Sequence, residues 1–214
     1  MNYLDMLPVE LLHEIAGDSE PAYKALMLAY PRFARDVTPG TRLDYMVSFG
    51  HDIRVSHRCI IWKRNGKWHR HGKPAIIYAS GNELYFRNGK EHRDDGPAVI
   101  YINGDTYWYR EGLAHRDDGP AVIINDAQMW YQNGNLHHDN GPAVIYANGE
   151  QRWYVYGVLH REDGPAAIYA SGTNEWYQTG KLHRDDGPAI IYSTGEEHWY
   201  INGVLFSIVL ANKK

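Results

Sequence analysis

A repeat of 23 residues occupies about two-thirds of this 214-residue chain and limits what the chain can fold into. Prolines recur at intervals of 23, 23, 22, 23 and 23 residues, and histidines, glycines and aromatic residues keep the same register. Because a unit this short cannot bury a core alone, stacked neighbours must share one continuous core. The recurring prolines are Pro74, Pro97, Pro120, Pro142, Pro165 and Pro188.

Each unit contains two short runs of β-forming residues. The first is Pro-Ala-Val-Ile-Tyr, as in residues 142–146, and the second centres on an aromatic pair, as in residues 153–154. Asn-Gly pairs such as residues 148–149 and 133–134 predict tight hairpin turns after each run. The His-Arg-Asp-Asp-Gly segment that follows predicts an irregular connector. The fold class predicted is mainly β, an elongated single-layer antiparallel array of β-hairpin repeats.

One aromatic residue per unit forms a predicted structural ladder. Neighbouring residues of a strand point to opposite faces, so the tyrosine that usually follows each ladder residue belongs to a second column. Cross-strand aromatic pairs contribute about 0.2–1 kcal/mol each. The ladder consists of Trp62, Tyr85, Trp108, Trp130, Trp153, Trp176 and Trp199.

The array has three irregular places. One interval is a residue short at positions 124–127, which predicts a bulge or a tightened turn. In the last unit the polar connector is replaced by an apolar segment, so residues 204–210 are predicted to form a C-terminal cap. The first unit, from position 60 to Pro74, is degenerate, and Cys59 beside it is predicted to be a buried strand residue.

Residues 1–48 have a helical pattern instead. Apolar residues fall on one helical face, a proline lies in the first turn and Gly17 follows the last turn. Two further short helices are predicted near residues 21–29 and 32–37. The chain therefore divides into a helical module, 1–48, and an array, 49–214, with six full or near-full units plus the C-terminal cap. The first helix carries Leu7, Pro8, Leu11, Leu12 and Ile15.

Charge and composition exclude several classes of protein. The 22 Lys+Arg and 26 Asp+Glu give a net charge of −4, which argues against nucleic acid as a partner and makes a membrane unlikely. No segment has the length and apolarity of a membrane span or the pattern of a secretory signal. The single cysteine cannot form an internal disulfide, which fits a reducing compartment.

The repeated histidines, each followed closely by aspartate, raise the question of a metal site. Metal ligands must converge to about 2.0–2.2 Å from the ion, whereas the repeat places equivalent side chains about 10 Å apart. We therefore expect the aspartates to bind connector N–H groups and the histidines to pack beside the leucine or tyrosine column. No serine or cysteine nucleophile accompanies the His-Asp pairs, so no metal, no cofactor and no enzymatic activity are predicted.

Four positions that change between units are candidates for partner recognition. In repeat arrays such positions commonly carry specificity, although the alternative is that they are solvated hairpin residues. They are Thr106, Arg152, Glu175 and His198.

The period, the aromatic-Tyr-x-Asn-Gly-x-x-His half and the glycine-containing half resemble MORN repeats over about residues 58–205. The variant with His-Arg-Asp-Asp-Gly-Pro-Ala is similar to that of multi-repeat proteins of large DNA viruses of amoebae. The segment around Leu7, Pro8, Leu11, Leu12 and Ile15 resembles the start of an F-box. The Asp-Asp-Gly-Pro connector departs from the simpler MORN pattern.

The resemblance implies a protein-protein interaction repeat protein, with the F-box-like residues docking a Skp1-type adaptor and the repeats recruiting targets to a host ubiquitin ligase. The alternative is a structural scaffold or virion-associated protein whose helices cap the sheet, with self-association, including a homodimer, through the array. The location expected is the cytoplasm, that of the host if the protein is viral, or the virion.

Overall fold

The computed structural model describes residues 51–55 and 58–211, which divide into two compact units between Asn103 and Gly104. The helical module predicted for residues 1–48, with all five of its candidate adaptor-binding residues, lies outside the described residues. The described residues form strands, turns and loops, and they include no helix with the length and apolarity that crossing a membrane requires.

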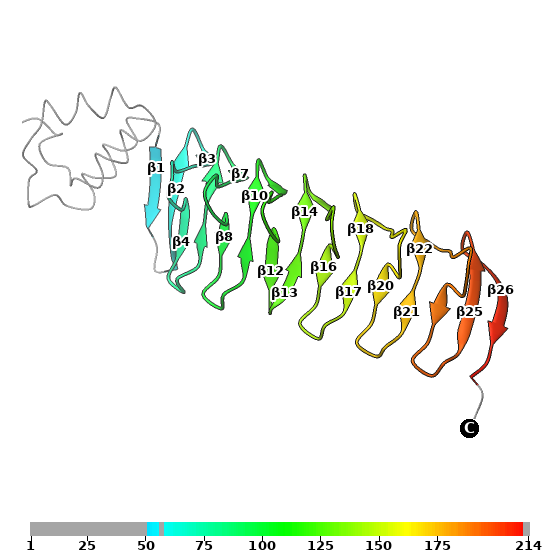
Figure 1. Ribbon diagram of the computed structural model, residues 1–214. Helices are drawn as coiled ribbons and strands as arrows, with labels where there is room; N and C mark the ends of the chain where they lie inside the picture. Colours follow the sequence, from blue (N-terminus) through cyan, green and yellow to red (C-terminus); the bar gives the residue numbers. More distant parts are fainter. Residues whose placement is uncertain (1–50, 56–57, 212–214) are drawn as a thin grey trace, which may run out of the picture. The chain divides into compact units, whose positions relative to one another are not determined.

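The described residues of the first unit form eight strands. Figure 1 shows them at the blue-to-green end of the array. Its sheet has the order β1-β2-β4-β5-β8, all neighbours being antiparallel, with β3 paired to β2 and with β6-β7 as a separate hairpin. The strands are β1 (His51–Val55), β2 (Cys59–Arg64), β3 (Lys67–Trp68), β4 (Ile76–Tyr78), β5 (Glu83–Leu84), β6 (Phe86–Arg87), β7 (Lys90–Glu91) and β8 (Val99–Ile100).

The second unit continues the same pattern of strands. They are β9 (Thr106–Tyr107), β10 (Tyr109–Arg110), β11 (Leu113–Ala114), β12 (Val122–Ile124), β13 (Ala127–Met129), β14 (Tyr131–Gln132), β15 (Asn135–Leu136), β16 (Val144–Ile145), β17 (Gln151–Arg152), β18 (Tyr154–Val155), β19 (Val158–Leu159), β20 (Ala167–Ile168), β21 (Asn174–Glu175), β22 (Tyr177–Gln178), β23 (Lys181–Leu182), β24 (Ile190–Ile191), β25 (Glu197–Ile201) and β26 (Val204–Val209). The sheet order is β9-β12-β13-β16-β17-β20-β21-β24-β25-β26. The prediction of a mainly β chain with an antiparallel sheet and hairpins is confirmed.

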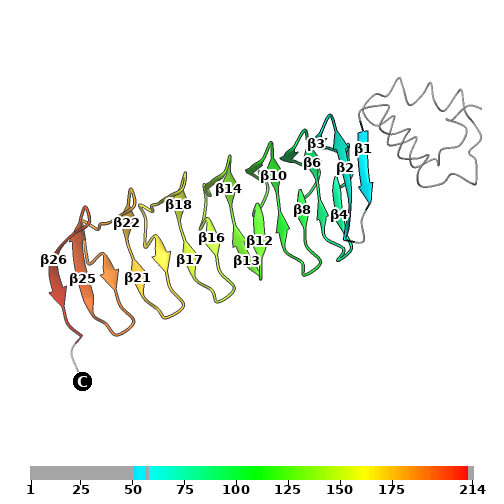
Figure 2. The same ribbon diagram turned by 180° about the vertical axis from the view of Figure 1, so that it is seen from behind.

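Each complete repeat contributes two strands to the sheet and one separate hairpin. In the repeat that starts at Pro142, β16 pairs with β17, and β18 pairs with β19. Figures 1 and 2 show the hairpins at β14, β18 and β22 along one edge of the second unit. The chain passes from sheet to hairpin at the ladder residue: Trp153 N–H donates to the carbonyl of Ala166 (2.8 Å), and its carbonyl accepts from His160 N–H (3.1 Å).

Two turn types alternate along the chain. The turn after each Pro-Ala-x-Ile-Tyr run has three residues, as at 147–149, where Gly149 (φ 86°) donates its N–H to the carbonyl of Tyr146 (2.9 Å). The hairpin turns have two residues, both with positive φ, as at Asn133 (49°) and Gly134 (82°). Positive φ at both positions is the type I′ geometry, whose twist suits a two-residue hairpin.

The shortened repeat contains a tightened turn, one of the two forms predicted. Asn125 (φ 47°) and Asp126 (φ 65°) form a two-residue turn between paired Ile124 and Ala127. Losing one residue therefore changes the turn type and leaves the strand pairing intact.

The part of the core that recurs in every repeat lies at the start of each sheet run. The alanine that follows each repeat proline is 0% exposed in every repeat, and the residue after it is buried as well. These alanines are Ala75, Ala98, Ala121, Ala143, Ala166 and Ala189. In the first unit Cys59 packs against the cluster of Ala75, Ile76 and Phe86, but it is half-buried, so the prediction of a buried thiol was only partly correct.

The last strand carries the apolar residues predicted for a cap. β26 pairs with β25, with a register shift between Trp199 and Tyr200, and Phe206 lies edge-on to the Trp199 ring at 6.1 Å. Most of the β26 side chains are nevertheless exposed: Val204 is 67% and Phe206 59% exposed. β26 ends the strand order, so among the described residues its outer edge has no paired strand.

Candidate interaction surface

The arginine of each connector stacks on the ladder residue eight positions earlier. The guanidinium carbon lies 4.1 Å from the centre of the Trp153 ring for Arg161 and 4.3 Å from that of Trp176 for Arg184. The same stacking occurs for Arg70 on Trp62, Arg93 on Tyr85 and Arg116 on Trp108. In the repeat that has histidine in place of this arginine, His138 stacks on Trp130 with ring centroids 4.9 Å apart. A cation over an aromatic face is stabilised by the ring quadrupole.

The same guanidinium makes two hydrogen bonds within its connector. Arg184 Nε donates to Asp186 (2.8 Å) and its terminal nitrogen donates to the carbonyl of Pro188 (3.4 Å). Gly187 lies against the guanidinium, where an added Cβ would meet it at 2.8 Å. Glycine at position 187 therefore allows the guanidinium to approach the backbone. It is not needed for a left-handed conformation, since its φ lies outside that region.

These ion pairs lower the pKa of the second connector aspartate. Hydrogen bonding to the neighbouring arginine, followed by its charge, holds the pKa of each of these carboxyls below the usual value. The shift affects Asp95, Asp118, Asp163 and Asp186. The sequence prediction that connector aspartates bind backbone N–H groups missed these arginine contacts, which the eight-residue spacing between ring and arginine could have indicated.

The connector histidines join neighbouring repeats. Asn202 N–H donates to His183 Nδ1 (3.1 Å), and His183 Nε2 lies 3.3 Å from Asp185. Because Nδ1 accepts a hydrogen bond from the backbone N–H, the ring proton is on Nε2, which donates to the carboxylate. Equivalent Nδ1 contacts occur at His69, His115, His137 and His160. The histidines thus have specific hydrogen bonds beyond the packing role predicted for them.

No group of three or more histidine, cysteine or acidic side chains within the described residues converges as a metal site would require. The imidazoles of five connectors instead each face one carboxylate of their own connector, as in His137 with Asp139 (2.9 Å).

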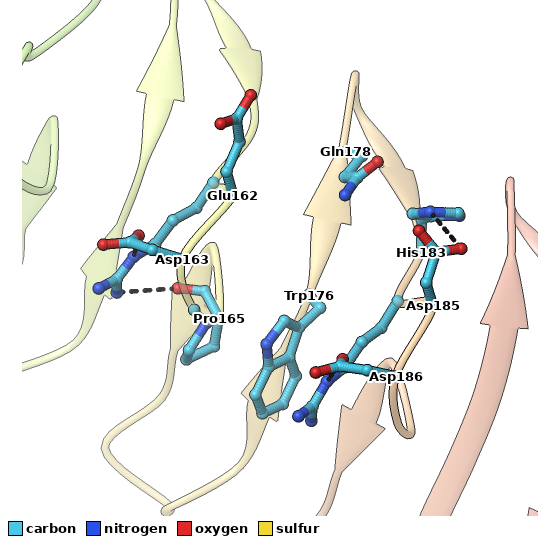
Figure 3. Close-up of a pocket in the computed structure, with 11 residues that line it drawn as sticks. Glu162, Asp163, Pro165, Trp176, Gln178, His183, Asp185 and Asp186 are labelled. Atoms are coloured by element: carbon cyan, nitrogen blue, oxygen red, sulfur yellow. Dashed lines mark hydrogen bonds and ion pairs between the residues drawn. The ribbon is translucent and has the colours of Figure 1, made fainter.

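The connectors form ridges with grooves between them. Figure 3 shows one groove in the second unit, with Glu162, Asp163 and Pro165 on one wall, Trp176 and Gln178 on its floor, and Asp185 and Asp186 beyond. Its volume is about 580 Å³, and the preceding groove, between residues 138–141 and 160–163, has a volume of about 620 Å³.

The sheet face opposite the ladder residues carries the tyrosine column and three of the four predicted partner-binding residues. Arg152, Glu175 and His198 occupy equivalent register positions, opposite Val144, Ala167 and Ile190. Thr106 is not equivalent to them: it pairs with Ile123, as Gln151 pairs with Ile145. Since neighbouring residues alternate between faces, Tyr107 is the residue that belongs to this column.

Polar side chains on this face are held by tyrosines. Glu175 accepts hydrogen bonds from Tyr169 (2.9 Å) and Tyr177 (3.1 Å). Burial, reinforced by the Glu175 carboxylate, raises the pKa of Tyr169 to about 12 and also raises that of Tyr177. Arg152 lies 5.3 Å from the Tyr146 ring and 5.5 Å from that of Tyr169.

Comparison with known proteins gives no relative: the chain matches no protein-family model and no curated protein. The seven ladder residues all lie within the described part, whereas Leu7, Pro8, Leu11, Leu12 and Ile15 do not.

Proposed function

We propose that this chain is a non-enzymatic protein-protein interaction protein built on MORN-like repeats. The observation that carries the proposal is one register position whose residue changes in every repeat while its surroundings stay constant. The residues at this position are Leu84, Tyr107, Met129, Arg152, Glu175 and His198. In repeat arrays a constant frame with changing surface residues is typical of recognition.

The connector contacts support a non-enzymatic function. Five connector histidines face an acidic side chain two positions later, at 2.9 Å in three repeats, 3.3 Å for His183 and 3.8 Å for His160. The imidazole Nδ1 is occupied by a backbone N–H in each of five repeats. A catalytic base needs a distinct substrate-facing nitrogen and a nucleophile beside it. These pairs are better explained as links between repeats.

The F-box-like segment makes a Skp1-type adaptor the first partner to test. The full chain would be titrated calorimetrically with a host adaptor, alongside the double variant Leu7→Ala/Leu12→Ala. Micromolar or tighter binding that the double variant loses would establish adaptor docking, the contact through which a host ubiquitin ligase in the cytoplasm would be engaged. Equal heats of binding for the full chain and the double variant would contradict adaptor docking.

A self-associating scaffold is the second candidate, and strand β26 favours it. An exposed strand edge with apolar side chains is a template for pairing with another chain. Sedimentation of the full chain should then show a dimer or larger species, and Ile208→Lys/Val209→Lys should return it to the monomer. A monomer at all concentrations would contradict this candidate.

A further inference from the structure

One hairpin of the second unit differs from the others in the character of its tip. In β18-β19 the residues Val155, Tyr156 and Val158 are 39%, 63% and 43% exposed. The equivalent tips of the neighbouring hairpins are Gln132-Asn133-Gly134-Asn135 and Gln178-Thr179-Gly180-Lys181. The tip at 155–158 is therefore an apolar patch flanked by polar hairpins.

Tyr156 is held in an unfavourable backbone conformation. Its φ is 46°, a left-handed value. Four other hairpins have asparagine at this position, Glu111 and Thr179 are further exceptions, and Tyr156 is the aromatic one. The asparagines are Asn65, Asn88, Asn133 and Asn202. Asparagine tolerates this region, whereas a bulky side chain there is an outlier. One face of the Tyr156 ring stacks on His137 at 4.2 Å, and most of the side chain remains exposed. Strain kept at an exposed aromatic residue points to a role in binding.

A groove with an apolar floor adjoins this tip. Val155 lies on its floor beside Trp153, between the ridges 138–141 and 160–163, and the groove volume is about 620 Å³. The residues at the position of Val155 in three other grooves are polar: Arg87, Gln132 and Gln178. We name it the Val155 groove.

The walls of the Val155 groove carry an excess of acidic side chains, with three carboxylates and one arginine, Arg161, which pairs with Asp163 at 2.8 Å. Asp139, Glu162 and Asp163 are 67%, 87% and 84% exposed. In an earlier repeat Arg110 pairs with the first connector aspartate, Asp117, at 2.8 Å. Val155 occupies the position equivalent to Arg110, and Glu162 the position equivalent to Asp117. The residue at position 155 therefore offers Glu162 no positive charge. The Val155 groove therefore combines an apolar floor with negative walls.

We propose that the Val155 groove and the tip at 155–158 form a docking site for an extended peptide segment of a partner protein, with an aliphatic or aromatic anchor flanked by lysine or arginine. The anchor contacts Val155 and Tyr156, and the basic side chains face Glu162, Asp139 and Asp163. This site rests on the proposed interaction function and names where it occurs and what chemistry it recognises.

The spacing of the grooves adds a constraint on the partner. Successive grooves are separated by two strands, about 10 Å, and an extended peptide covers this distance in about three residues. A basic residue three positions from the anchor therefore reaches the groove of Gln178 and Asp185 shown in Figure 3.

The test uses fluorescein-labelled nine-residue peptides and the full chain, measured by fluorescence anisotropy. Two peptides carry a central Leu or Phe, with Lys one and three residues away on both sides and Gly or Ser elsewhere. Two comparison peptides replace the central residue by Ser or every Lys by Glu. We expect saturable binding of the Leu or Phe peptide and binding at least about tenfold weaker for both comparison peptides.

Three variants locate the binding. Val155→Gln/Tyr156→Asn gives this hairpin residues found at the same positions of its neighbours, and we expect at least about tenfold weaker binding with no fall in the thermal midpoint. Thr179→Asn is the matched control: it relieves a positive φ of 49° in the next hairpin and should leave binding unchanged. Gln178→Val should strengthen binding by giving the next groove an apolar floor.

The proposed site would be overturned if neither the Leu nor the Phe peptide bound the full chain. It would also be overturned if Val155→Gln/Tyr156→Asn bound them as tightly as the original chain. If Arg152→Ala/Glu175→Gln abolished the binding instead, recognition would lie on the tyrosine face, and the interaction function would stand without this groove. The adaptor titration and the sedimentation experiment test that function independently, so the two failures are distinguishable.

Discussion

At the scale of single residues, the connector arginine explains why four residue types recur together. Arg184 contacts the Trp176 ring, the Asp186 carboxylate and the space left by Gly187, and it also donates to the backbone carbonyl of Pro188. The ring, the carboxylate and the missing Cβ each depend on residue type, because a guanidinium is planar and has fixed donor directions. The first aspartate of the motif pairs with the histidine instead, as Asp185 does with His183.

Gly187→Ala should destabilise the protein by about 1–3 kcal/mol. The added Cβ would displace the Arg184 guanidinium, weakening its ring contact and its charge-assisted hydrogen bonds. Urea unfolding measures the change. In a double-mutant cycle with Arg184→Ala the cost of Gly187→Ala should shrink, because the group that clashes has been removed. An equal cost in both backgrounds would show that the guanidinium is not the reason for the glycine.

Asp118→Asn should lower stability at neutral pH but not in acid. Hydrogen bonding to Arg116 and its charge lower the pKa of Asp118 in the folded chain. The ionised carboxylate therefore stabilises the fold above its unfolded pKa of about 3.9, and this contribution is lost as the pH falls through the lower folded value. Thermal midpoints of both chains, measured from pH 7 to pH 3, should converge at the acidic end. A constant difference would contradict the ion pair.

At the scale of elements, turn chemistry decides where each strand ends. The sequence correctly predicted glycine turns after both runs, because Asn-Gly and its relatives favour positive φ. In the three-residue turns only the glycine has positive φ, and the asparagine at position 148 does not. The hairpin turns need positive φ at two positions, which explains why asparagine recurs before the glycine there.

Asp126→Gly should stabilise the shortened repeat by about 0.5–1 kcal/mol. Asp126 has φ 65° at the second position of a type I′ turn, where glycine has no steric penalty. Chemical denaturation would measure the gain. Asn125→Gly serves as the comparison, because asparagine already suits the first position, and its effect should be smaller. A loss of stability in Asp126→Gly would mean that the aspartate side chain itself supports the turn.

At the scale of the whole molecule, neighbouring repeats are joined through backbone groups and histidines. Gly203 N–H donates to the carbonyl of Leu182 (2.8 Å), and Asn202 N–H donates to His183 Nδ1 (3.1 Å). Each link joins a repeat only to the next one, so stability should be a sum of repeat and nearest-neighbour terms.

His183→Ala should weaken one junction and leave distant ones intact. Removing the imidazole leaves the Asn202 N–H without its acceptor, which costs about 1–3 kcal/mol when the group is shielded from water. Hydrogen exchange should accelerate at residues 202–203. Exchange at Gly134, three repeats before Gly203, should not change. Uniform acceleration across the second unit would show that the array opens as one cooperative block.

The sequence alone determined the repeat and the strand-turn order, because these depend on residues close together in the chain. It also predicted a bulge or a tightened turn at 124–127, of which the structure has the second, and the apolar last strand. It grouped Thr106 with Arg152, Glu175 and His198 as changing positions, but the register makes Thr106 equivalent to Gln151, and a one-residue difference places a side chain on the opposite face.

Only the tertiary structure decided which groups meet across strands. The arginine-ring stacking, the histidine links and the Tyr169-Glu175-Tyr177 contacts join residues whose distance depends on register and turn geometry. The Val155 groove likewise exists because two connectors lie on either side of one strand. Periodicity fixes which residues are equivalent, but contact across strands depends on how successive units pack, and that is a property of the folded array.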